Sequence, residues 1–282
     1  MAGVRNRTES LPWIRLPNSS TKAGNGWRTN TIRFGQARPA NLFRRYWKLP
    51  GVSGNVSVLD VGCGPGYVSA ATAERGAEPI GLDFSSEMIG IAKKTFPQIE
   101  FREGDAQNLP FAAESFDRVV ANFALLHLAD PERACAEACR VLRPGGKFGF
   151  TTWAQAAENA FVRLVDDAIS KHANLEVDLP PGPPYYLFAS PEEFRNALEQ
   201  AGFDGSSMTF KVHTIEWKVP IARFIFDAEL NAGVRTAGLL AKQTPEALRA
   251  IQSAIEQAVR PYAHGAEFRI PKAAYIIAVS KR

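Results

Sequence analysis

Residues 58–69 read VLDVGCGPGYVS, an apolar run that ends in an acid and is followed by three closely spaced glycines. The apolar residues predict a buried strand over 56–61, and the sequence after Gly66 predicts a helix that extends to about Arg75. Glycines let the backbone approach a ligand closely, and the first turn of a helix presents free N–H groups. A strand, a glycine turn and a helix in this order predict a ligand site at the carboxyl end of the strand.

The following sequence repeats this alternation of strand and helix up to residue 153. Further strands are predicted at 79–83, 99–103, 116–123 and 147–153. Ser85 or Ser86 can cap one intervening helix, and Asp130 caps another that begins at Pro131. Such alternation favours right-handed crossovers and a mostly parallel sheet, so the chain is predicted to have an α/β fold.

The remaining sequence predicts additional elements around a proline-rich aromatic loop, PPGPPYY at 180–186. Helices are predicted at 158–173, from 191 to about 202, within 220–242 and from 245, and strands at 208–217 and 273–280. Periodic apolar side chains support the helix from 245, because Leu248, Ile251 and Ile255 share one face.

Asp83 ends the second predicted strand, about 20 residues after the glycine turn, where a carboxylate can hold the hydroxyls of a ribose. This spacing also fits NAD, but the Gly62-x-Gly64-x-Gly66 turn is tighter than the dinucleotide pattern. Two simpler interpretations stay open at this point. The glycines can form a tight turn without a ligand, and Asp83 can cap the next helix.

With GDAQNLPF (104–111), NFALLH (122–127) and VLRPGGKFGF (141–150), the chain resembles the class I methyltransferases that use S-adenosylmethionine (SAM), especially the ubiquinone and menaquinone branch. The resemblance covers about residues 40–153. It implies SAM as methyl donor, with S-adenosylhomocysteine as product, and a Rossmann-like, doubly wound sheet of seven strands. The implied strand order is 3-2-1-4-5-7-6, with the last strand antiparallel and helical lid insertions added.

The same resemblance assigns cofactor contacts by position. The implied cofactor-binding residues are Asp60, Gly62, Cys63, Gly64 and Gly66 around the methionine part, Asp83 at the ribose, Phe84, Met88, Asp105 and Ala106 around the adenine, and Asn122 and Phe123 near the methyl group.

His127 is the candidate catalytic base, because it follows the fourth strand and an imidazole titrates near neutral pH. The alternative is that His127 packs beneath the cofactor or caps the loop. Cys135 and Cys139 lie one helical turn apart without other predicted ligands, so no metal site is predicted.

The acceptor is expected to be a small organic molecule, since aromatic residues are frequent in the segments that select it in the resembled family. The candidate acceptor-binding residues are Tyr46, Trp47, Trp153, Tyr185 and Tyr186. A largely apolar pocket with few polar groups is typical of small-molecule sites. The alternative is that about half of these aromatics fill the core.

Charge and composition limit the other partners. The net charge of +4 is mild, and NFALLH lacks the Asn/Asp-Pro-Pro-aromatic motif of nucleic-acid methylating relatives, so nucleic acid is not expected as a partner. A membrane is not expected either, because no window approaches the roughly 20 apolar residues needed to span a bilayer. Three cysteines and no signal-like segment favour a cytoplasmic protein, as a monomer or homodimer.

Residues 1–37 are predicted to form a basic extension, for which targeting is the alternative. Residues 38–282 are predicted to form the methyltransferase domain, with a core at 54–156 and a lid at 180–265.

Three other functions remain open. A methyltransferase-like enzyme that has changed its reaction, such as a cyclase, would keep the same motifs. An NAD-dependent oxidoreductase is disfavoured by the tight glycine turn and by the lack of a Tyr-x-x-x-Lys pattern. A binding module without catalysis is the third.

Overall fold

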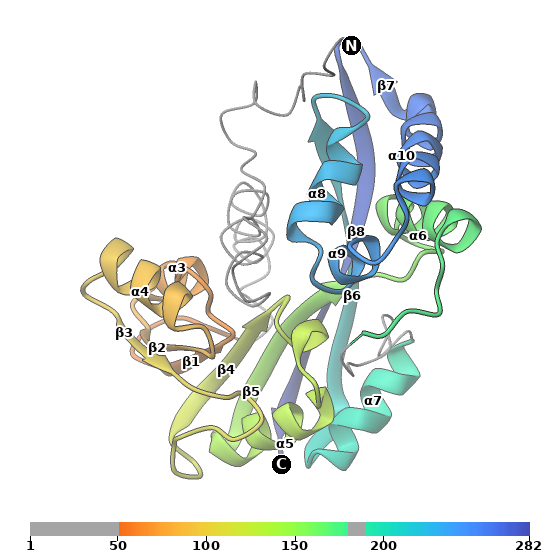
Figure 1. Ribbon diagram of the computed structural model, residues 1–282. Helices are drawn as coiled ribbons and strands as arrows, with labels where there is room; N and C mark the ends of the chain where they lie inside the picture. The colour runs from red at the N-terminus through yellow and green to blue at the C-terminus, as the bar shows by residue number, and fades with distance from the viewer. Residues whose placement is uncertain (1–50, 180–189) are drawn as a thin grey trace.

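The computed structural model describes residues 51–179 and 190–282, which form a twisted sheet with helices on both faces (Figure 1). The strands are β1 Ser57–Val61, β2 Glu78–Asp83, β3 Glu100–Glu103, β4 Phe116–Asn122, β5 Leu142–Trp153, β6 Phe203–Val219, β7 Ala263–His264 and β8 Glu267–Lys281. Their order is β3-β2-β1-β4-β5-β8-β6, with β7 paired to β8. β1 to β5 are parallel, and β8 is antiparallel to both of its long neighbours. This confirms the α/β class and the predicted order. The short β7 was not predicted.

The structure describes eight α-helices, most of which begin at a capping side chain. They are α3 Tyr67–Ala73, α4 Ser86–Thr95, α5 Pro131–Val141, α6 Ala160–His172, α7 Pro191–Gln200, α8 Phe224–Ala232, α9 Val234–Leu240 and α10 Pro245–Val259, with 3-10 turns η2 Leu125–His127 and η3 Arg260–Tyr262. Ser85, Asp130, Ser190 and Thr244 each accept a backbone N–H at a helix start. A side-chain oxygen at this position satisfies one of the free donors of the first turn.

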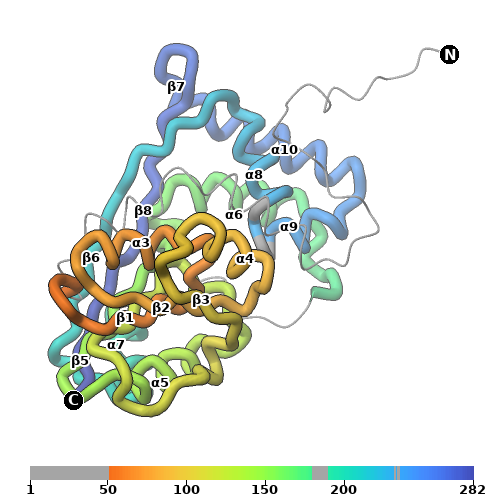
Figure 2. Tube along the Cα trace, turned by 90° about the vertical axis from the view of Figure 1, so that its left-hand side faces the viewer, coloured from red at the N-terminus to blue at the C-terminus, as the bar shows by residue number. Residues whose placement is uncertain are grey.

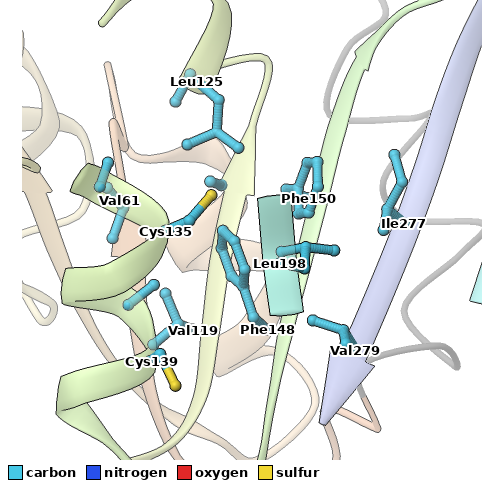
Figure 3. Packing of buried hydrophobic residues seen from close by; sticks show 14 of the residues in the cluster. Val61, Val119, Leu125, Cys135, Cys139, Phe148, Phe150, Leu198, Ile277 and Val279 are labelled. Atoms are coloured by element: carbon cyan, nitrogen blue, oxygen red, sulfur yellow. The ribbon is translucent and has the colours of Figure 1, made fainter. Parts of the chain in front are cut away.

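The main core lies between the sheet and the helices α5 and α7 (Figure 3). Cys135 of α5 packs on one side, Phe148 and Phe150 of β5 in the middle, and Leu198 of α7 beside Ile277 of β8. These residues belong to strands and helices with continuous apolar faces, the pattern from which these elements were predicted.

A second core forms where β6 and β8 extend beyond the rest of the sheet. Trp153, the last residue of β5, pairs with Ala274, so residues 267–273 of β8 continue past the carboxyl end of β5. Phe161 of α6, Ile251 of α10 and Ile270 of β8 are buried together there. The helices α6, α8, α9 and α10 therefore gather beside this extension, as two views show (Figures 1 and 2).

The structure differs from the sequence prediction in the extent of several elements. β5 begins at Leu142, so the predicted turn at 143–146 is part of the strand, with Gly145 at φ 72°. The predicted lid range 180–265 includes α7 and β6, but both belong to the main sheet and its core. The division at residue 37 falls outside the described residues and stays a prediction. In the described part, no helix has the length and apolar character needed to cross a membrane.

Candidate active site

The glycine turn after β1 is fixed by backbone bonds and by close packing. The N–H groups of Gly62 and Cys63 both donate to the carbonyl of Leu82, at 2.8 and 3.0 Å. A Cβ on Gly62 would lie 2.5 Å from the Cβ of Ala124, and one on Gly66 would lie 2.6 Å from the ring of Phe101. Both positions also have positive φ, which favours glycine. These two glycines are therefore required by the fold itself.

Gly64 differs from the other two glycines of the turn. Its φ is 51°, yet nothing lies within 4 Å of the position that a Cβ would occupy. The neighbouring Cys63 side chain is buried against Ile89 and Phe101, where desolvation raises the pKa of its thiol far above the usual value. The turn thus presents bare backbone at Gly64 on one side and an unreactive thiol on the other.

Asp60, near the end of β1, is a buried acid, and one of its two carboxylate oxygens accepts no hydrogen bond from the described residues. Its side chain is only 1% exposed, and Oδ2 accepts a hydrogen bond from the hydroxyl of Ser69 at 2.6 Å. Oδ1 has no hydrogen-bond partner among the described residues. Burial raises the pKa of Asp60 to about 7. Because an unpaired buried oxygen is costly, this site suits a ligand that brings a donor, above all a cationic one.

Asp83 ends β2 and joins this strand to the glycine turn. Its Oδ2 accepts from the Gly64 N–H and its Oδ1 from the Ser85 N–H, both at 2.9 Å. Ser85, and not Asp83, caps α4, so the helix-cap interpretation of Asp83 is wrong. The Asp83 carboxylate thus lies beside the glycine turn at the carboxyl end of β2, where the resemblance places the ribose.

The residues implied around the adenine follow the ends of β2 and β3. The Phe84 side chain is 59% exposed, whereas Met88 and Ala106 are buried. The Gly104 N–H donates to the carbonyl of Asp83, which brings the segment after β3 alongside the end of β2. Asp105 is exposed, and its Oδ1 accepts from the Gln107 N–H at 2.8 Å.

The end of β4 carries Asn122 and Phe123, the residues implied near the methyl group. The Asn122 Oδ1 accepts from the Thr151 hydroxyl at 2.8 Å, and the Phe123 N–H donates to the same hydroxyl at 3.0 Å. Phe123 has φ 53°, a strained conformation for a bulky residue that persists only where its surroundings enforce it. Here the Phe123 ring is stacked on Trp153, with ring centroids 4.1 Å apart.

His127 ends the turn η2, and its N–H donates to the carbonyl of Ala124 at 3.0 Å. Although part of the residue is exposed, desolvation of the ring lowers the pKa of the imidazole to about 4, so the ring is neutral at pH 7. The catalytic role of His127 stays a prediction.

Of the predicted acceptor-binding residues, Trp153 lies at the carboxyl end of β5, next to Phe123. Tyr46, Trp47, Tyr185 and Tyr186 lie outside the described residues. Sequence reasoning missed one further group beside Trp153, the ammonium of Lys272. This residue lies in the part of β8 that precedes the predicted strand.

Lys272 is enclosed by aromatic rings from three elements. Its Nζ lies over the ring of Trp153 at 3.9 Å, over Phe161 at 4.1 Å and over Trp217 at 4.8 Å from the centroids. Desolvation lowers the pKa of Lys272 to about 8, partly offset by the negative charge of Glu229 on α8.

Comparison with known proteins agrees with this arrangement. Residues 59–150 match the family described as "Methyltransferase domain". A demethylmenaquinone methyltransferase of Renibacterium salmoninarum is 46% identical over 90 residues, which are 32% of this chain and 38% of that protein. The chain spans less than half the length of the first curated relatives it matches.

Solved structures share the fold over most of the chain. A putative methyltransferase from Bacillus halodurans has a TM-score of 0.54 at 18% identity, covering 87% of this chain and 99% of that one. The [4+2]-cyclase SpnF has a TM-score of 0.51 at 20% identity, covering 93% and 86%. At these identities the likeness concerns the fold alone. The matched residues 59–150 include most of β1, all of β2 to β4, most of β5 and the segments that follow β1 to β4, so this part of the chain is a class I SAM-dependent methyltransferase domain.

Proposed function

We propose that this protein transfers a methyl group from SAM to an oxygen, nitrogen or carbon atom of a small, partly apolar organic molecule by direct in-line displacement. The observation that carries the proposal is the unpaired Oδ1 of Asp60, buried behind a glycine turn that is bare at Gly64. A SAM molecule offers a cationic amine for this oxygen and ribose hydroxyls for Asp83. The residues present therefore fit the donor that the family uses.

Each group at this edge has a distinct part in the proposed binding. Asp60 and the turn 62–66 would hold the amino-acid end, Asp83 the ribose, and Phe84 with Asp105 and Ala106 the adenine. SAM supplies a methyl group on a sulfonium, which is already activated for transfer. The chain mainly has to position the acceptor, and such positioning contributes roughly 7–11 kcal/mol to catalysis.

Phe123 and Trp153 would form the apolar wall against which the acceptor lies. Stacked rings exclude water, which strengthens every polar interaction that remains in the site. An acceptor hydroxyl must also lose its proton, and we retain His127 as the proposed base. Its neutral ring has a free lone pair at pH 7, so it can take the proton at a ring nitrogen.

The names of the curated relatives support a small apolar acceptor, but those proteins are matched over less than half of their length. We also propose a cytoplasmic protein, monomeric or homodimeric, that acts without nucleic acid or membrane. The mild net charge supports this proposal. Residues 1–37 would be an extension of the domain, and Tyr46, Trp47, Tyr185 and Tyr186 would complete the acceptor site.

The test is methyl transfer from labelled SAM to the small-molecule fraction of an extract from the source organism. The purified protein is expected to label an organic-soluble compound, and Asp83→Ala is expected to abolish labelling together with S-adenosylhomocysteine binding in calorimetry. Binding without transfer to any compound would contradict the proposed reaction and favour an enzyme of this fold with a changed function, such as a cyclase. Absence of binding would contradict the SAM site itself.

A further inference from the structure

The aromatic cage around Lys272 adjoins the proposed acceptor wall. Trp153 has the Phe123 ring 4.1 Å from its centroid and the Lys272 Nζ 3.9 Å from it. Two groups this close to one centroid must occupy opposite faces of the indole. A single side chain therefore separates the ammonium from Phe123, the residue implied near the methyl group.

The aromatic rings of the cage attract the charge of Lys272 but give its N–H groups no hydrogen-bond acceptor. An ammonium has three N–H donors, and an aromatic face attracts the charge but offers no conventional acceptor. Among the described residues, Lys272 forms no hydrogen bond and no ion pair. Because Lys272 is half-buried, its N–H donors have lost part of their contact with water, and no protein acceptor replaces that water. A ligand with an anionic oxygen would restore it.

The acids near the cage do not fill this role. Glu229 of α8 is the charged group that acts on Lys272, but burial raises the pKa of Glu229, and its carboxylate is bonded to Thr236. Asp166 of α6 lies near Glu229, and burial raises the pKa of Asp166 to about 6. In the part of the chain that the structure describes, neither acid comes close enough to form an ion pair with the Lys272 ammonium, so neither supplies an acceptor for its N–H donors.

We propose that Lys272 determines acceptor specificity by binding an anionic oxygen on an apolar acceptor that lies against the Trp153 side of the site. This inference rests on the proposed function, since it concerns the acceptor of that reaction. A carboxylate or an ionised enol or phenol would each satisfy the ammonium, and charge-assisted bonds of this kind are the strong ones. A cationic acceptor would be rejected by the same charge.

Three probes of equal shape and different charge test this proposal: 2-naphthoate, its neutral amide 2-naphthamide, and 2-naphthylmethylammonium. Binding is followed by quenching of tryptophan fluorescence with S-adenosylhomocysteine present, since Trp153 and Trp217 form the cage. We expect 2-naphthoate to bind about tenfold or more tighter than the amide, and the ammonium to bind weakest. A parallel titration with 4-nitrophenol, which ionises near neutral pH where Lys272 is still charged, tests whether a phenolate can replace the carboxylate.

Two variants of the same residue separate charge from packing. Lys272→Met keeps the length of the side chain and should remove the preference for the anion, while Lys272→Arg should retain most of it. Lys211→Met is the matched control, because Lys211 is an exposed lysine on β6 outside the cage. It should leave the preference unchanged.

Other results would overturn the inference in distinguishable ways. Equal binding of amide and anion, a preference that survives in Lys272→Met, or no quenching by any probe would each contradict it. Calorimetry with S-adenosylhomocysteine is the separate check: if the cofactor product binds and the anion preference is absent, only the role of Lys272 fails. If the product does not bind, the proposed function fails as well.

Discussion

The glycines of the turn after β1 provide a matched pair of substitutions at the scale of single residues. Gly62→Ala adds a Cβ at 2.5 Å from Ala124 and strains a positive φ, so we expect a loss of about 2–4 kcal/mol of unfolding free energy. Gly64→Ala meets no neighbour, so it should cost only about 1–2 kcal/mol, from its φ. Urea unfolding measures both.

Cofactor affinity should separate the two variants further. In Gly64→Ala the new methyl group occupies the open face of the turn, so S-adenosylhomocysteine should bind at least about tenfold more weakly in calorimetry. A Gly64→Ala protein that binds as tightly as the original would show that the ligand does not approach the turn at this residue.

Asp60 should make both stability and cofactor binding depend on pH. Its pKa is about 7 in the folded protein and 3.8 in the unfolded reference, so the folded state keeps a proton that the unfolded state releases. Stability is then fully present below about pH 4 and falls as pH rises towards 7, by at most about 4 kcal/mol. Asp60→Asn should flatten this part of the curve measured by urea unfolding.

The affinity for S-adenosylhomocysteine should increase with pH, whereas stability decreases, because the cationic amine of this ligand pairs with the ionised form of Asp60. S-adenosylhomocysteine affinity should rise between about pH 5 and 7 in the original protein, by no more than about tenfold per pH unit, and lose most of this rise in Asp60→Asn. A binding curve with the same slope in both proteins would rule out Asp60 as the titrating group.

Contacts between single residues could be predicted from the sequence where the order of strands and turns alone brings the residues together. Gly64 lies in the turn after β1 and Asp83 ends β2, the parallel neighbour of β1, so their contact follows from the order of the elements. Lys272 was not predictable, because its partners Trp153, Phe161 and Trp217 come from β5, α6 and β6, and only the packing of these elements creates the cage.

At the scale of elements, α5 holds the segment that follows β3. The buried Glu137 accepts from the Leu109 N–H at 2.8 Å and pairs with Arg140, which in turn donates to the carbonyls of Leu109 and Phe111. Arg140 keeps the pKa of Glu137 below its usual range. The helix thereby positions the loop that carries Asp105.

Glu137→Ala should therefore cost about 2–3 kcal/mol of unfolding free energy and weaken S-adenosylhomocysteine binding, because the Leu109 N–H and Arg140 lose a charged partner. Glu132→Ala, an exposed acid on the same helix, should cost less than about 1 kcal/mol and leave binding unchanged. Thermal unfolding and calorimetry measure the two effects. Equal effects of both variants would mean that α5 does not position the loop.

The extent of β6 and β8 shows what the sequence could not reveal about elements. The prediction placed these strands at 208–217 and 273–280, but they cover Phe203–Val219 and Glu267–Lys281. The added part of β8 contains Pro271 and several charges, which disfavour a strand when considered alone. They are tolerated because this part pairs only with β6 and β7 among the strands and packs against helices on one face.

At the scale of the whole molecule, β6 and β8 connect two hydrophobic cores. Phe203 and Ile277 are buried in the main core, and Val219 and Ile270 of the same two strands in the second. The strands pair without a break from Thr209 to Val219, across the boundary between the cores. Separating the cores would break this ladder, so the two are expected to unfold together.

Two substitutions that each leave a cavity, one in each core, test whether the two cores unfold together. Ile251→Ala in the second core and Leu198→Ala in the main core should each cost about 2–5 kcal/mol, since both side chains are almost fully buried. If the cores unfold together, Ile251→Ala lowers the hydrogen-exchange protection of β4 amides as much as that of α10 amides, although β4 is not part of the second core. Loss of protection in α10 alone would show a lid that opens by itself, and the acceptor site around Trp153 and Lys272 would then open with it.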